Sequence, residues 1–143
     1  AYPAIDCDRY GSLAFRVIGA PWMNQAGLIR DLKPGLRSCG VEMRPYRYQP
    51  QGGKYQGVAL DGILFSVGNP TAFYPVTAGM LVLTALIQHH GDKVFVGGRD
   101  DWYDKLNGTD APRKTLEGGD LSELFQSWID AQDEYLEHKV DLY

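Results

Sequence analysis

Apolar residues recur at two different periods along this chain, and the order of the two periods constrains the fold more than any other feature. In residues 12–19 alternate side chains are apolar, which predicts a strand with one buried face. In residues 22–33 the apolar side chains return at helical spacing, and the Pro34-Gly35 pair is predicted to end that helix. The chain therefore begins with a strand followed by a helix.

The same two periods continue through the next sixty residues. Residues 41–49 predict a second strand, and Pro45 within it indicates an edge position because proline donates no ladder hydrogen bond. Residues 55–67 predict a third strand that forms a hairpin with the second. Residues 75–90 predict a nearly buried helix, and residues 93–98 a short buried strand.

The resulting order is β-α-β-β-α-β, which predicts an α+β fold of the ferredoxin-like type. Its antiparallel sheet would carry both helices on one face, with the third strand between the first two. A polar loop is expected at residues 99–119, and an amphipathic helix at residues 120–140. At 143 residues the whole chain, 1–143, is expected to form a single domain whose core is residues 1–98.

Charge is unevenly distributed along the chain. The net charge is −4, but residues 1–60 hold eight Lys and Arg against four Asp and Glu, whereas residues 61–143 hold six against fourteen. A role in coating nucleic acid is therefore not expected, because such proteins are strongly basic. A chain with one basic and one acidic face can stack head to tail on its own copies. The alternative is that the acidic half is only a solvated helix and loop.

Cofactors and membrane contacts are not expected. The two cysteines, Cys7 and Cys39, are too few for a disulfide scaffold or a zinc site, and we expect two free thiols. The longest apolar stretch, residues 76–87, is shorter than the ~20 residues that a membrane span needs. A soluble protein of the cytoplasm or of a virion is favoured over a secreted one.

Catalytic motifs are mostly absent from the sequence. Neither phosphate-binding glycine motif is present, and no G-x-S-x-G element marks a nucleophile. His89 and His90 are adjacent, so on a helix they point about 100° apart and do not face one metal. A polar loop with several carboxylates is usually solvated, but its acids together with His89 or His90 are the alternative site of a small hydrolase: Asp100, Asp101, Asp104 and Asp110, with Asn107 beside them.

The most distinctive surface candidate is the run of Arg and Tyr on the second strand and its hairpin. These residue types dominate protein–protein hot spots, and they also stack on bases and pair with phosphates. The third strand lacks the aromatic run of an RNA-recognition sheet, so a protein partner is favoured over a nucleic-acid module at residues 44–55. An ordinary edge strand protected by its arginines is the plain alternative. The predicted partner-binding residues are Arg44, Tyr46, Arg47, Tyr48, Tyr55 and Trp102.

These features together predict a structural or assembly subunit that acts through protein–protein contacts. Self-association into a symmetric homo-oligomer is expected, and a virion or tail-type particle is one setting for it. The alternatives are the small hydrolase that uses Asp100–Asp110 with His89 or His90, and the nucleic-acid module at residues 44–55.

Overall fold

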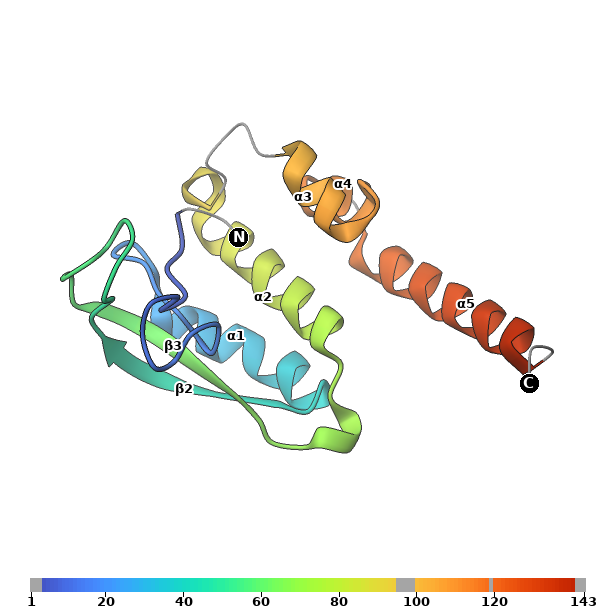
Figure 1. The fold of residues 1–143 in the computed structure, drawn as a ribbon, viewed down its shortest axis with the longest axis horizontal. Helices are drawn as coiled ribbons and strands as arrows, with labels where there is room; N and C mark the ends of the chain where they lie inside the picture. The colour runs from blue at the N-terminus through green and yellow to red at the C-terminus, as the bar shows by residue number, and fades with distance from the viewer. Residues whose placement is uncertain (1–3, 95–99, 119, 141–143) are drawn as a thin grey trace. The chain divides into compact units, whose positions relative to one another are not determined.

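The chain forms two compact units that combine helices with a small sheet. The computed structural model describes residues 4–94, 100–118 and 120–140 (Figure 1). Unit 1 comprises residues 1–97 and unit 2 comprises residues 98–143. Unit 1 holds a three-stranded antiparallel sheet with two long helices, and unit 2 is helical in its described part. The α+β class predicted from the sequence is therefore confirmed.

The sheet has the strand order β1-β3-β2, in which β1 is Val17–Ile18, β2 is Val41–Tyr48 and β3 is Leu60–Val67. Both pairings are antiparallel, and β2 lies at an edge, as predicted. The first strand is much shorter than expected because Phe15 has a φ of 61°, a left-handed value that interrupts extended backbone. The third strand begins five residues late because Gly57, with a φ of 77°, belongs to the turn before it.

Helix α1, Gln25–Ser38, runs past the proline that was predicted to end it. Its start is capped by Asn24, whose side-chain oxygen accepts a hydrogen bond of 3.1 Å from the backbone N–H of Gly27. Pro34 lies inside the helix and removes one backbone donor. Leu36, two residues further, is almost fully buried, and the burial of this side chain offsets the lost hydrogen bond.

Helix α2, Pro75–His90, follows the short 3-10 helix η1, Pro70–Ala72, and has the predicted bounds. It is less buried than predicted, because its buried residues are only Ala78, Met80, Ala85 and Leu86. Gly91, with a positive φ of 49°, caps its end and begins a second 3-10 helix, η2, Gly91–Lys93. The predicted strand at residues 93–98 is wrong at Lys93, which is part of η2, and residues 95–98 lie outside the described part of the chain.

The core of unit 1 lies between the sheet and the two long helices. Helices α1 and α2 lie side by side on one face of the sheet (Figure 1). Their apolar stripes meet side chains from β2 and β3 in one cluster, which accounts for the spacing predicted from the sequence. The buried side chains of this cluster include Leu28, Leu32, Leu36, Val41, Ile63, Ala85 and Leu86.

Unit 2 replaces the predicted loop with helices. Helix α3 is Asp100–Asn107, helix α4 is Ala111–Leu116, and helix α5 is Leu121–Val140. The loop prediction for residues 99–119 is therefore wrong over most of its described length. Its polar residues form ion pairs, of which Asp104–Arg113 joins α3 to α4. Pro112 lies in the first turn of α4, where proline costs no hydrogen bond. Helix α5 matches its prediction within one residue.

Within the described ranges, no helix is both long and apolar enough to cross a membrane.

Candidate functional site

Strand β2 presents an arginine and two tyrosines on one face. Side chains alternate along a strand, so Arg44, Tyr46 and Tyr48 point to the same side. The rings of Tyr46 and Tyr48 are stacked, with centroids 6.4 Å apart and planes inclined by 26°. The guanidinium carbon of Arg44 lies 5.7 Å from the centre of the Tyr46 ring, a cation–π distance. These three residues, the Tyr/Arg face, form an aromatic patch with one positive charge.

Tyr48 is the fixed member of this face. Its hydroxyl donates a hydrogen bond of 2.8 Å to the Oδ1 atom of Asp6. Its ring covers Gly62, where an added Cβ would lie only 2.7 Å from a ring carbon. Burial raises the pKa of the Tyr48 phenol well above its usual range, and the hydrogen bond to Asp6 raises it further. Tyr48 therefore holds the neighbouring Tyr46 ring in place rather than offering its own hydroxyl to a ligand.

The other predicted partner-binding residues are not part of this face. Arg47 points to the opposite side of β2 and forms an ion pair of 3.8 Å with Asp61. Tyr55 donates a hydrogen bond of 3.0 Å to the backbone oxygen of Ala4. Trp102 belongs to helix α3 of unit 2, and its side chain lies outside what the structure describes.

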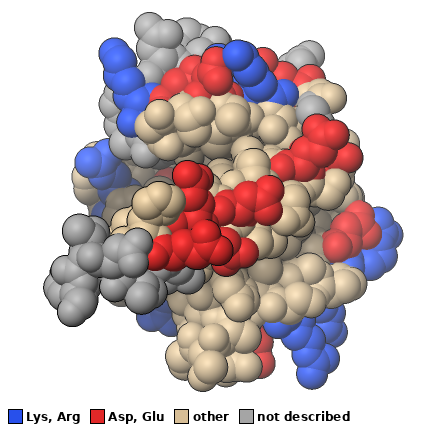
Figure 2. Space-filling view, turned by 90° about the vertical axis from the view of Figure 1, so that its right-hand side faces the viewer, with Lys and Arg blue, Asp and Glu red and all other residues tan. Residues whose placement is uncertain are grey.

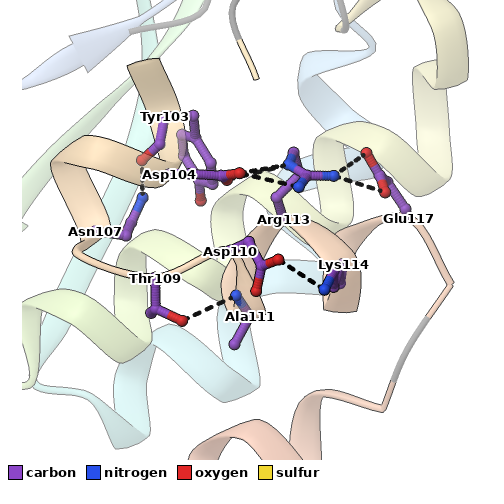
Figure 3. A network of polar contacts seen from close by, with 9 residues as sticks. All are labelled: Tyr103, Asp104, Asn107, Thr109, Asp110, Ala111, Arg113, Lys114 and Glu117. Atoms are coloured by element: carbon purple, nitrogen blue, oxygen red, sulfur yellow. Dashed lines mark hydrogen bonds and ion pairs between the residues drawn. The ribbon is translucent and has the colours of Figure 1, made fainter. Parts of the chain in front are cut away.

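Two of the predicted acidic-site residues of unit 2 are paired with basic side chains (Figure 3). Arg113 lies between Asp104 and Glu117, at 2.9 Å and 3.2 Å, and these bonds raise the pKa of its guanidinium. Lys114 pairs with Asp110 at 2.6 Å and lowers the pKa of that carboxyl. These contacts fasten α3 to α4 and stabilise the first turns of α4.

The remaining members of the acidic stretch show no convergence on one point. Asn107 donates a hydrogen bond of 2.8 Å to the backbone oxygen of Tyr103 within its own helix. The side chains of Asp100 and Asp101 lie outside the described residues. In the described part of the chain, no group of three or more His, Cys, Asp and Glu is arranged to hold a metal ion.

The two histidines join the end of α2 to the start of α1. His89 pairs with Asp31 through a contact of 2.8 Å between Nε2 and Oδ2, and hydrogen bonds from Arg30 and His89 lower the pKa of Asp31 to about 2. The Nε2 atom of His90 accepts a hydrogen bond of 3.1 Å from the backbone N–H of Asn24, and burial lowers the pKa of His90. Both histidines belong to unit 1 and the acidic stretch to unit 2, and each unit is described by itself.

Asp6 is the residue of this site that sequence reasoning missed. It lies forty-two positions before Tyr48, and it also accepts a hydrogen bond from the backbone N–H of Asp8. No local motif marks such a partner. The available signal was the pair of aspartates at residues 6 and 8, upstream of the first strand. Aspartates so close together are typical of turns in which the side chain hydrogen-bonds nearby backbone groups.

The sequence matches the family described as exo-beta-N-acetylmuramidase NamZ, C-terminal, over residues 6–143. The chain belongs to this family. No curated protein matches it. Among solved structures it is similar to a DUF1343 family protein from Bacteroides fragilis, with a TM-score of 0.85 and 15% sequence identity over 99% of this chain. The chain spans 38% of the length of that protein. At this identity the likeness concerns the fold alone.

Family membership corrects the function predicted from the sequence. The prediction of a structural or assembly subunit of a virion-like particle is wrong, because the family is the C-terminal part of an exo-beta-N-acetylmuramidase, which is a glycosidase. The hydrolase alternative fits the family better. The error has a physical cause: glycosidases need two suitably placed carboxylates, which come from distant parts of a chain and leave no local motif. The absence of nucleotide and nucleophile motifs was therefore no argument against a glycosidase.

Proposed function

We propose that this chain is part of a glycosidase that removes a β-linked N-acetylmuramic acid residue from the end of a glycan, and that it contributes contacts to that glycan through the Tyr/Arg face. The observation that carries the proposal is the family match over residues 6–143. The chain corresponds to 38% of the solved relative, which leaves most of that longer protein to supply other parts of its site.

Among the described residues, the carboxyl groups with shifted pKa values support a binding role over a role in proton transfer. A glycosidase needs a general acid that stays protonated near neutral pH, so its pKa is raised. The described carboxyls with shifted pKa values are Asp31, Asp110 and Asp120, and each is shifted downward by hydrogen bonds that favour the charged form. Such groups suit ion pairs and helix capping.

The chemistry of the Tyr/Arg face suits an N-acetylmuramic acid residue. One side of a pyranose ring presents C–H groups, which pack against the negative face of an aromatic ring such as that of Tyr46. The lactyl group of muramic acid carries a carboxylate, which the exposed guanidinium of Arg44 can pair with. Tyr48, held by Asp6, keeps the Tyr46 ring at a fixed angle.

The proposal is tested by titrating the chain with the disaccharide N-acetylmuramyl-β-1,4-N-acetylglucosamine and recording amide NMR shifts. We expect shifts at β2 that Tyr46→Ala and Arg44→Gln abolish, while Arg47→Gln, on the opposite side of the strand, leaves binding unchanged. Equal binding by all three variants contradicts the proposed face. The same chain is incubated with 4-nitrophenyl β-N-acetylmuramide, and rapid release of nitrophenol by the chain alone would assign catalysis to its own carboxylates.

We also propose a ferredoxin-like topology, a single folding domain and self-association for this chain. The ferredoxin-like topology is supported by the antiparallel strand order β1-β3-β2. A single folding domain is proposed for residues 1–143, and its test is one cooperative unfolding transition by calorimetry. Self-association is supported by opposite charges: unit 1 holds nine Lys and Arg against six Asp and Glu, and unit 2 holds five against twelve.

A further inference from the structure

Unit 1 contains an apolar groove on the side of the sheet that carries the helices. It lies between the first half of α2, the ends of β2 and β3, and the turn before β1, and its volume is about 640 Å³. Pockets that bind small molecules measure roughly 300–1,000 Å³ and are mostly apolar with a few polar groups. Its walls include Phe15, Phe65, Phe73 and Val82, with Arg16 and Ser66 as polar members.

Phe15 lines this groove in a conformation that costs energy. Its ring is 74% exposed, and its φ of 61° is left-handed, which is rare for an aromatic residue. The turn is fixed by hydrogen bonds of 2.9 Å from the N–H of Phe15 to the oxygen of Cys7 and from the N–H of Arg16 to the oxygen of Leu13. Strained residues of this kind cluster at ligand clamps.

The lining of the groove includes a glycine, Gly79, that no neighbouring atom requires. Gly79 lies in the interior of α2, where glycine is less favourable than alanine. Nothing lies within 4 Å of the position that its Cβ would take, so no neighbour excludes a side chain there. By contrast, Gly35 on α1 faces Leu81, 3.2 Å from its own Cβ position. The absence of a side chain at Gly79 keeps the groove open.

Arg16 supplies the charge that selects a ligand. Its side chain is exposed, and it forms no ion pair with any residue that the structure describes. The hydroxyl of Ser66 is a second polar group in the same lining. A free guanidinium beside an apolar hollow is complementary to a molecule with an apolar body and one carboxylate at its end.

We propose that this groove binds a straight-chain fatty carboxylate, with its chain against Phe15, Phe73 and Val82 and its carboxylate paired with Arg16. This inference goes beyond the proposed glycan contact, because the groove and the Tyr/Arg face involve different residues. The groove is concave and has an unpaired cation beside it, which favours a small charged molecule as its occupant. A protein partner would bind a flatter surface and would not need a groove.

The experiment uses the whole chain and sodium decanoate as the probe, with amide NMR shifts and calorimetry as readouts. We expect shifts at Phe15, Phe73 and Gly79. Decanol, which has the same chain without the charge, is expected to bind roughly tenfold more weakly, since a charge-assisted bond contributes about that factor. Arg16→Gln is expected to reduce the affinity for decanoate to that for decanol.

The decisive variant is Gly79→Leu, which places a large side chain in the lining of the groove. Leucine favours helix, and its Cβ atom would meet no neighbour at this position. It is expected to stay folded and to lose decanoate binding. Gln88→Leu adds the same side chain at an exposed position of α2 outside the groove lining and is expected to bind decanoate normally. Circular dichroism of both variants confirms that the fold is kept.

Any of three binding results would overturn the inference: no decanoate binding by the unmodified chain, equal binding by Gly79→Leu and Gln88→Leu, or equal affinity for decanoate and decanol. Light scattering that shows a dimer dissociated by Gly79→Leu would assign the groove to a second copy instead, and would also overturn it. Tyr46→Ala is expected to leave decanoate binding intact and Gly79→Leu to leave disaccharide binding intact, so the two proposals fail separately.

Discussion

The two units of this chain are stabilised by different forces. In unit 1, side chains such as Leu28 and Ile63 are 0% exposed between the helices and the sheet. In unit 2, the described contacts include few buried apolar groups, and Ile129 and Tyr135 of α5 are 51% and 64% exposed. Helix α3 is joined to α4 by the ion pair of Asp104 with Arg113, and Arg113 also pairs with Glu117 at the end of α4. Buried apolar side chains hold the helices and strands of unit 1 in place, whereas ion pairs at the surface contribute much of the stability of unit 2.

This difference bears on where a precise binding site is expected. Side chains hold a fixed geometry when their neighbours are packed, and the Tyr/Arg face and the groove both belong to the packed unit. Unit 2 has a strongly acidic surface, to which the exposed Asp130, Asp133, Glu134 and Glu137 of α5 contribute. Acidic side chains gather on the face drawn in Figure 2, with Lys and Arg mainly at its margins. Salt should therefore affect unit 2 more than unit 1.

The largest expected effect is the removal of a core side chain from unit 1. Leu28→Ala leaves a cavity between α1, α2 and the sheet, and is expected to lower the free energy of unfolding by about 2–5 kcal/mol. The matched change in unit 2, Leu124→Ala, is expected to cost less because α5 has fewer buried neighbours. Urea denaturation combined with hydrogen exchange measures both units, and equal losses would contradict the comparison.

The next effect concerns the support of the Tyr/Arg face. In Gly62→Ala the new methyl would lie 2.5 Å from the backbone oxygen of Ile18 and 2.7 Å from the ring of Tyr48. Overpacking of this kind costs about 1–3 kcal/mol, and the displaced Tyr48 should also weaken disaccharide binding. Thermal unfolding and the NMR titration test this. A variant with unchanged stability would show that the ring moves away freely.

The ion pairs of Arg113 can be tested directly in unit 2. Arg113→Lys keeps the charge but lacks the planar fork that contacts Asp104 and Glu117 together. We expect faster hydrogen exchange in α3 and α4 with no change in unit 1. Raising the salt concentration to about 1 M, where the Debye length falls to about 3 Å, should act on the unmodified chain in the same direction. Equal protection in both proteins would contradict the role assigned to Arg113.

A smaller effect of opposite sign is expected on α2. Gly79→Ala should raise the free energy of unfolding by roughly 0.5–1 kcal/mol, because alanine favours helix and its methyl meets no neighbour. Thermal unfolding followed by circular dichroism measures this change. A destabilised variant would mean that the glycine has a structural role in unit 1.

The smallest effect is the acid response of the Asp31 contacts. The pKa of Asp31 is lowered from 3.8 to about 2, so its contribution to stability is present above pH 3.8 and is lost as the pH falls towards about 2. Asp31→Asn should therefore be less stable than the unmodified chain at pH 5, and the difference should vanish near pH 2. Melting temperatures across this range test it, and a constant difference would assign the loss to packing.

Much of unit 1 was predictable because its signals are local. Helical spacing at Leu28 and Leu32, and the long apolar run before Gly91, predicted α1 and α2, and β-branched and aromatic runs predicted β2 and β3. The sequence overestimated Pro34 as a terminator because the burial of Leu36 is a tertiary effect. It also missed α3 and α4, whose ion pairs form between residues nine positions apart, such as Asp104 and Arg113.

The candidate site was predictable only in part. The sequence analysis placed Tyr46, Arg47 and Tyr48 on one surface, whereas in the structure Arg47 points to the other side of β2 and pairs with Asp61. Asp6 and the groove could not be found, because each depends on residues far apart in the sequence that meet only in the fold. The family was likewise invisible to motif analysis, since no short catalytic signature lies in the chain.

The bond between Tyr48 and Asp6 also has a consequence for the order of folding. It joins positions forty-two residues apart, and the N-terminal segment is further paired to Gly19 through Asp6. Tyr48 lies at the end of the β2–β3 hairpin, so we expect its bond to Asp6 to form after β2 and β3 have met. Phe15 and Arg16 should therefore take their places late in folding, and changes there should speed unfolding more than they slow refolding.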